Sequence, residues 1–189
     1  MNIRITEHIQ KSIDAKTRIL NDPALLKEVE GAAQLCAQAL KKGGKILFAG
    51  NGGSASDAQH LAAELVGRYK FDRAPLAAIA LTTDTSALTA IGNDYGFDDV
   101  FSRQVSALAG EHDVFIGIST SGNSANILKA CEAAREKKCQ IISMSGTKGK
   151  LTEIADFSLA VPADETATIQ EAHIMLGHIL CDVIEQTLF

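Results

Sequence analysis

Five short apolar runs along the chain predict its strands. They lie at residues 46–49, 77–81, 114–118, 141–144 and 157–161. Each is rich in Ile, Val, Leu, Phe or Ala, which is typical of strands buried on both faces of a sheet. Helical patterns separate most of the runs. The sequence therefore predicts an α/β fold, a three-layer sandwich around a five-stranded parallel sheet.

Two helices are expected before the first strand. Ile5, Ile9 and Ile13 recur every four residues and predict an amphipathic helix. Asn21-Asp22-Pro23 then ends that helix and begins a second one, because Asp is a good N-cap and Pro fits the first helical turn. The second helix runs to Gly43-Gly44. These helices either pack against another subunit or cover one face of the sheet.

The first and third strands lead into loops rich in Gly and Ser, at 50–54 and 119–124. In a flavodoxin-like strand order, 2-1-3-4-5, these two strands are neighbours, and ligands bind beyond their carboxyl ends. We therefore expect both loops at one crevice. Residues 86–91 are predicted as a helix, 92–96 as a loop, and 166–188 as the last helix.

The loop Gly50-Asn51-Gly52-Gly53-Ser54 predicts an anion site. Glycine lets a ligand approach the backbone, and the start of a helix presents free N–H groups to an anion. Ser54 and Asp57 resemble a capping box. His60 and Glu64 follow four residues apart, so they share one face of the helix. They are either an acid/base pair or ordinary solvent-facing residues.

The stretch Ser119-Thr120-Ser121-Gly122-Asn123-Ser124 offers four hydroxyl groups at the start of a helix. Hydroxyls and N–H groups can bind phosphate without lysine, whereas a well-capped turn needs fewer hydroxyls. The loop at 50–54 does not match the known nucleotide-binding motifs. The loop at 50–54 lacks the lysine of a P-loop, and Ala55 stands where a dinucleotide fingerprint has its third glycine.

The last helix carries a second polar cluster, in which His173 is expected at the surface; its members are Gln170, Glu171, His173 and His178. Gln170 and His178 are eight residues apart, a rise of about 12 Å along a helix. Both therefore fit one metal ion poorly from the same regular helix. We expect either that a neighbouring subunit supplies part of the site, or that Gln170 precedes the helix.

Length, net charge and cysteine spacing limit the kinds of protein that this chain can be. The 189 residues suit one domain over residues 1–189, with 1–43 as an N-terminal helical extension in an oligomer interface. A net charge of −5 gives no basic field for nucleic acid or an anionic membrane. No apolar run approaches the length of a membrane span, and the first residues lack a signal-peptide core. The four cysteines form no CxxC pair, which favours reduced thiols in a cytoplasmic protein.

Taken together, these segments resemble the SIS (sugar isomerase) domain family, and closely the phosphoheptose isomerases. The similarity extends over the whole chain and is carried by residues 50–54, 57–64, 92–94 and 118–126, with Gln170, Glu171, His173 and His178. The resemblance implies conversion of sedoheptulose 7-phosphate to D-glycero-D-manno-heptose 7-phosphate, the first step toward the ADP-heptose of lipopolysaccharide. It also implies a cytoplasmic homotetramer with active sites between subunits and one zinc ion in each subunit.

The resemblance also implies roles for individual residues. Glu64 and His178 match the catalytic acid/base pair. The metal positions are His60, Glu64, Gln170 and His178. The substrate-binding positions are Asn51, Gly52, Gly53, Ser54, Glu64, Asn93, Asp94, Ser119, Thr120, Ser121, Ser124 and Gln170. Glu64 is assigned as the base that moves a proton from C1 to C2 through an enediol(ate), and His178 as the acid at the oxygens.

Two other functions stay open. The initiator-associating protein that binds the bacterial replication initiator DnaA shares the domain and resembles this chain at both ends, but it lacks counterparts of Glu64 and His178. This chain retains both residues. A sugar-phosphate sensor without turnover is the weaker alternative.

Overall fold

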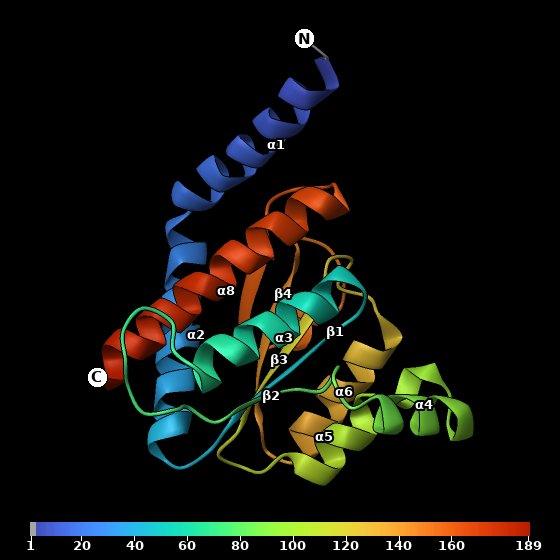
Figure 1. Cartoon of the computed structure of the whole chain (residues 1–189). Helices are drawn as coiled ribbons and strands as arrows, with labels where there is room; N and C mark the ends of the chain where they lie inside the picture. Colours follow the sequence, from blue (N-terminus) through green and yellow to red (C-terminus); the bar gives the residue numbers. More distant parts are fainter. Residues whose placement is uncertain (1–2) are drawn as a thin grey trace.

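A five-stranded parallel sheet forms the centre of the molecule in the computed structural model, which describes residues 3–189 (Figure 1). Its strand order is β2-β1-β3-β4-β5, and every neighbouring pair is parallel. The strands are β1 (Ile46–Gly50), β2 (Ala78–Ala80), β3 (Val114–Ser119), β4 (Gln140–Gly146) and β5 (Phe157–Val161). The predicted fold class and strand order are both confirmed.

Helices cover both faces of this sheet and complete the three layers (Figure 1). One face packs against α2 (Pro23–Lys41), α3 (Gly53–Val66) and α8 (Thr166–Leu188). The other packs mainly against α5 (Ser102–Leu108), α6 (Ala125–Glu136) and the short α7 (Leu151–Ile154), with α4 (Thr85–Asp94) and a 3₁₀ turn, η1 (Phe97–Asp99), at its margin. Successive side chains of β1 point to opposite cores, so Phe48 joins the first and Leu47 the second.

The two N-terminal helices behave differently. The Asp22 side chain caps α2 by accepting hydrogen bonds from two backbone N–H groups of its first turn, and Pro23 stands at the helix start, as predicted. The helix α2 covers the sheet beside α8. By contrast α1 (Ile3–Leu20) reaches away from the domain and buries only Ala15 and Ile19 (Figure 1). Its isoleucines at positions 5, 9 and 13 are 50 to 55% exposed.

Two local predictions are wrong. The helix α4 continues through Gly92, Asn93 and Asp94, which the sequence placed in a loop, and Tyr95 N–H still bonds to the Ile91 carbonyl at 2.9 Å. The start of α3 has no capping box either. Gly52, with φ of +57°, turns the chain so that the helix begins at Gly53, and no side chain caps it.

All four cysteines are buried and unpaired. Burial raises the pKa of Cys131, Cys139 and Cys181 to about 12, and it raises that of Cys36 as well. Among the helices of residues 3–189, none combines the length and the apolar character that crossing a membrane requires.

Candidate active site

A polar pocket opens where β1 and β3 end, at the crevice expected from the strand order. It has a volume of about 290 Å³. Glycine is required at position 50 because a Cβ there would lie 2.5 Å from the Ser54 carbonyl oxygen, and a Cβ at Gly53 would lie 2.6 Å from the Gln170 amide and displace that side chain. The pocket is lined by Asn51, Gly52, Gly53, Ser54, Ile118, Ser119, Thr120, Ser124, Thr166 and Gln170. The structure thus brings together most of the predicted substrate-binding positions.

Three serine hydroxyls gather after β3: those of Ser119 and Ser124 line this pocket, while exposed Ser121 lies outside its lining and accepts from the Asn123 backbone N–H at 3.2 Å. Ser119 Oγ lies 2.9 Å from Ser124 Oγ and 3.4 Å from Ser121 Oγ. Ser124 is the N-cap residue of α6, yet its hydroxyl makes no capping hydrogen bond. The hydroxyls therefore bond to one another and keep donor and acceptor capacity for a ligand. This arrangement favours an anion site over the alternative of a simple capped turn.

A pair of amides joins the two loops. Asn51 and Asn126 exchange hydrogen bonds in both directions, each at 2.9 Å. Asn126 is buried in the first turn of α6. The pair therefore fixes the glycine loop relative to the serine loop.

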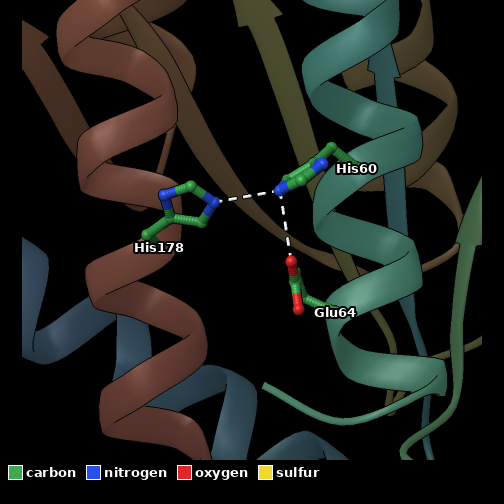
Figure 2. A group of neighbouring side chains, drawn as sticks. All are labelled: His60, Glu64 and His178. Atoms are coloured by element: carbon green, nitrogen blue, oxygen red, sulfur yellow. Dashed lines mark hydrogen bonds and ion pairs between the residues drawn. The ribbon is translucent and has the colours of Figure 1, made fainter. Parts of the chain in front are cut away.

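Three candidate catalytic side chains meet farther along α3 and α8 (Figure 2). His60 Nε2 lies 3.2 Å from Glu64 Oε1 and 3.0 Å from His178 Nε2. His60 and Glu64 share one face of α3, while His178 reaches toward them from α8. The solvent-facing interpretation of His60 and Glu64 does not account for this convergence with His178.

The close approach of α3 and α8 explains how these side chains meet. Gly177 packs against Leu61, and a Cβ at Gly177 would lie only 2.5 Å from Leu61 Cδ1. Both residues are buried, and each is adjacent in sequence to a member of the cluster. Any larger residue at Gly177 would force Leu61 to move and would push the helices apart.

The cluster fits a metal ion by the chemistry of its donors. One ligand atom from each of His60, Glu64 and His178 lies within 4.8 Å of the others. Imidazole nitrogen and carboxylate oxygen are common zinc ligands, and three protein ligands leave a position open for substrate. The Nε2 atoms of His60 and His178 are only 3.0 Å apart, and two lone pairs at this distance would repel each other. A proton shared between the two nitrogens, or a cation bound by both, removes the repulsion.

Two neighbours of the cluster, Asp57 and Tyr69, are not among the site residues predicted from the sequence. Asp57 lies one turn before His60, and its Oδ2 is buried without a hydrogen-bond partner. Burial raises the pKa of Asp57, and His60 and His178 offset this only partly. The Tyr69 ring stacks on His178, with centroids 5.7 Å apart. The three-residue spacing of Asp57 and His60 places both on one side of the helix and could have revealed Asp57. Nothing in the sequence of the loop after α3 indicates Tyr69.

Other predicted positions lie elsewhere. Asn93 and Asp94 are exposed at the end of α4, where Asn93 Nδ2 donates to Asp94 Oδ1 at 2.8 Å, and neither lines the pocket. Gln170 lies inside α8 and lines the pocket, so the alternative that it precedes the helix is wrong, and the alternative that a neighbouring subunit supplies part of the site stays a prediction. His173 is fully buried, so its expected surface position is also wrong.

Comparisons with known proteins identify the family. A SIS domain family model matches residues 9–146. The chain is 55% identical to a phosphoheptose isomerase of Solidesulfovibrio magneticus over 98% of its own length and 90% of that protein's length. The chain belongs to the phosphoheptose isomerases of the SIS domain family.

Solved structures of phosphoheptose isomerases agree with this family assignment. The structure from Neisseria gonorrhoeae is 51% identical and superposes with a TM-score of 0.91, covering 97% of both chains. The structure from Francisella tularensis is 41% identical, with a TM-score of 0.92 and 97% coverage of both chains. The sequence-based prediction of an isomerase of this family is confirmed.

Proposed function

We propose that this chain isomerises sedoheptulose 7-phosphate to D-glycero-D-manno-heptose 7-phosphate, a step of heptose biosynthesis that leads to lipopolysaccharide. The observation that carries the proposal is the Glu64–His178 pair beside a hydroxyl-lined pocket, in a chain 55% identical to a phosphoheptose isomerase. A ketose-to-aldose conversion needs a base at carbon and an acid at oxygen, and the pair supplies both.

In the proposed mechanism Glu64 removes a proton from C1 of the ketose. The C–H electrons form the C1–C2 double bond, and the C2 carbonyl oxygen takes a proton from His178. In the cis-enediol that results, Glu64 returns its proton to C2. The O1 hydroxyl then gives its proton back to His178 as the C1 aldehyde forms. His60 contacts both residues and orients them.

Zinc is part of the proposal, with His60, Glu64 and His178 as ligands. Gln170 lies on the same regular helix as His178, about 12 Å away along its axis, so it would serve as a further ligand only from a neighbouring subunit. When bound, the ion would polarise the substrate carbonyl and stabilise negative charge on the enediolate oxygens. Glu64 then serves as a ligand, as the base, or in both roles.

The remaining candidate residues hold the substrate. Ser119, Thr120, Ser121 and Ser124 are assigned to the phosphate, and Asn51, Gly52, Gly53, Ser54 and Gln170 to the sugar. Six residues of helix separate Ser54 from His60, a rise of about 9 Å. An open-chain sugar phosphate bound at the pocket would extend C1 and C2 along α3 toward Glu64.

We also propose a homotetramer with active sites between subunits. Asn93 and Asp94, the other substrate-binding candidates, lie away from the pocket of their own chain. The exposed isoleucines of α1 offer an apolar surface for a second copy. In this proposal residues 1–43 are the interface extension of a single SIS domain over residues 1–189. The unpaired buried cysteines support a cytoplasmic location.

The test is incubation of the purified protein with sedoheptulose 7-phosphate, with and without added zinc, while NMR follows the aldose phosphate. Product from the wild type and its absence with Glu64→Gln would support the isomerase and its base. Dependence on zinc would separate a metal-assisted route from simple acid/base catalysis. Light scattering measures the oligomer, and a monomer with full activity would contradict the shared site.

Binding of the sugar phosphate without product would contradict the isomerase and favour a sensor. If the protein neither binds nor turns over the sugar, a pull-down with the replication initiator DnaA tests the alternative of a non-catalytic SIS protein.

A further inference from the structure

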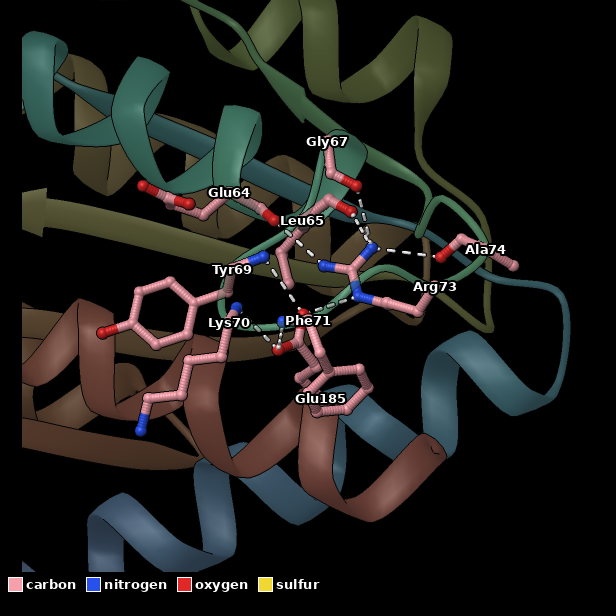
Figure 3. A network of polar contacts seen from close by, with 9 residues as sticks. All are labelled: Glu64, Leu65, Gly67, Tyr69, Lys70, Phe71, Arg73, Ala74 and Glu185. Atoms are coloured by element: carbon pink, nitrogen blue, oxygen red, sulfur yellow. Dashed lines mark hydrogen bonds and ion pairs between the residues drawn. The ribbon is translucent and has the colours of Figure 1, made fainter.

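A buried carboxylate near the C-terminus of α8 accepts hydrogen bonds from the loop that follows α3 (Figure 3). Glu185 has no exposed surface. Its carboxylate accepts hydrogen bonds from the backbone N–H groups of Tyr69 at 3.0 Å and Lys70 at 2.8 Å, with a longer contact of 3.4 Å from Phe71. Burial alone would raise the pKa of Glu185, but these donors and Arg73 hold it below its ordinary value.

Arg73 completes this network from the same loop. Its Nε donates to Glu185 Oε2 at 2.8 Å, and both side chains are at most 1% exposed. The two terminal nitrogens donate to backbone carbonyls at 2.9 to 3.2 Å, which belong to Glu64, Leu65, Gly67 and Ala74. A planar guanidinium with five donors is the side chain that can serve so many acceptors at once. We call Arg73, Glu185 and these backbone groups the Arg73–Glu185 clamp.

The clamp contacts both helices of the candidate active site. Arg73 Nη2 donates to the backbone carbonyl of Glu64 itself at 3.0 Å, at the end of α3, where the last carbonyls have no helical partner. On the other side Glu185 lies two turns after His178 on α8. The held loop also carries Tyr69, whose ring stacks on His178. The clamp therefore touches the proposed base through its backbone and the proposed acid through an aromatic ring.

The chain offers a second ion pair with a buried carboxylate for comparison, although its lysine side chain is 29% exposed. Asp113 is 3% exposed and accepts from Lys45 Nζ at 2.6 Å and from the Lys45 and Gly110 backbone N–H groups at 2.8 Å each. This pair lies at the amino ends of β1 and β3, opposite the pocket. It contacts none of the three catalytic candidates.

We propose that the Arg73–Glu185 clamp is a positioning device that sets the distance and orientation of Glu64 relative to His178. This inference rests on the proposed isomerase function. Proton transfer through an enediol needs one carboxylate to reach both C1 and C2, and misplacement by about 1 Å can lower a rate about 100-fold. The phosphate loop lies at the other end of the substrate, so binding does not depend on the clamp.

The experiment measures kcat, KM and solvent exchange for Arg73→Lys, Glu185→Gln and Tyr69→Leu. In D₂O, NMR compares deuterium incorporated at carbon with product formed. We expect Arg73→Lys and Glu185→Gln to lower kcat about 10- to 100-fold with KM near the wild-type value. We also expect a higher ratio of exchange to product, because a misplaced carboxylate loses its proton to water before returning it.

Tyr69→Leu keeps the backbone N–H that bonds to Glu185 and removes only the ring on His178, so it tests positioning without breaking the ion pair. Asp113→Asn is the matched control, since it breaks the other ion pair with a buried carboxylate. The control should lower the thermal unfolding midpoint and leave kcat per folded molecule and the exchange ratio unchanged.

Clamp variants that lose activity only in proportion to their folded fraction, with the wild-type exchange ratio, would overturn the positioning role. Variants with wild-type kcat and exchange ratio would overturn it as well. A wild-type protein that forms no product would overturn the proposed function, and the positioning role with it.

Discussion

The two ends of the parallel sheet use polar groups in different ways. At the amino end the Asp113 carboxylate bonds fully to protein donors, and the backbone is packed so closely that a Cβ at Gly44 would lie 2.1 Å from the His112 carbonyl oxygen. At the carboxyl end the Ser124 hydroxyl leaves its helix uncapped, and between α3 and α8, over the face of the sheet, His60 and His178 face each other through their Nε2 atoms (Figure 2). The polar groups around Asp113 complete the fold, while those of the pocket and of the histidine pair retain bonding capacity for a ligand.

The largest expected effect comes from Glu64→Gln in the cluster between α3 and α8. We expect kcat to fall by a factor on the order of 10²–10⁴, as for loss of a general base. The free energy of unfolding should hardly change, because the negative end of the helix dipole does not stabilise a carboxylate in the last turn of α3. NMR turnover and thermal unfolding measure the two effects. Glu153→Gln, at an exposed position, is the matched control, and an equal loss of activity there would contradict the assignment.

For Asp113→Asn at the amino end we expect lower stability and an unchanged kcat. Loss of the charge should cost about 2 to 3 kcal/mol in free energy of unfolding, since hydrogen bonds to charged groups contribute most when buried. Urea unfolding measures this cost, and the kcat of the folded protein should stay at the wild-type value. Asp164→Asn, in a surface pair that is more than 80% exposed on both sides, should change little. A lower kcat for Asp113→Asn would show that the Asp113 pair also affects the candidate catalytic residues.

His173 tests whether the carboxyl end also contributes to stability. Neither of its ring nitrogens has a hydrogen-bond partner among residues 3–189. Burial lowers the pKa of His173 to about 4, and the Ser145 backbone offsets this only in part. The neutral ring therefore stabilises the fold fully above about pH 6.5, and this contribution is lost as the pH falls toward 4.

From this difference in pKa, wild type should lose about 2 kcal/mol more than His173→Leu between pH 7 and pH 5. Urea unfolding at the two pH values measures the loss for each protein. Equal losses in both would show that His173 is not the group responsible.

The smallest expected effect is that of Ser124→Ala in the hydroxyl cluster. Loss of one hydrogen bond to a phosphate should raise KM about tenfold and leave kcat nearly unchanged. Ser158→Ala provides the contrast, because Ser158 accepts a 3.1 Å hydrogen bond from Ser143 between strands β4 and β5 and lies away from the pocket. Steady-state kinetics distinguish the two variants, and an unchanged KM for Ser124→Ala would remove that hydroxyl from the site.

The sequence predicts the sheet well because apolar runs between helices leave few alternatives, and a flavodoxin-like strand order is the one that brings the two polar loops to one crevice. The family resemblance also predicts most residues of the pocket, but not Ile118 and Thr166, and it predicts the His60–Glu64–His178 cluster together with Gln170, which lies in the pocket instead. The errors of the sequence-based prediction have physical causes. His173 looks like a surface residue in a polar cluster, but α8 is buried on a wide face. The extent of α4 was missed because Gly92, Asn93 and Asp94 are residue types typical of loops, yet the helix continues through them.

The Arg73–Glu185 clamp could not be predicted for another reason. Its two side chains are 112 residues apart, and most of its acceptors are backbone carbonyls that carry no sequence signal. A glutamate near the end of the chain looks like a solvated residue until the loop after α3 is seen to wrap around it. Long-range bonds from side chain to backbone are thus the part of the candidate site that pattern analysis does not reach.

The burial of every native cysteine has a practical consequence for studying assembly. Thiol reagents attack the thiolate, and a pKa of about 12 leaves almost none at neutral pH. A single cysteine introduced at exposed Ile9 on α1 would then be the reactive thiol of the folded chain. A fluorophore placed there, without removal of any native cysteine, would report directly on whether two copies meet along this helix.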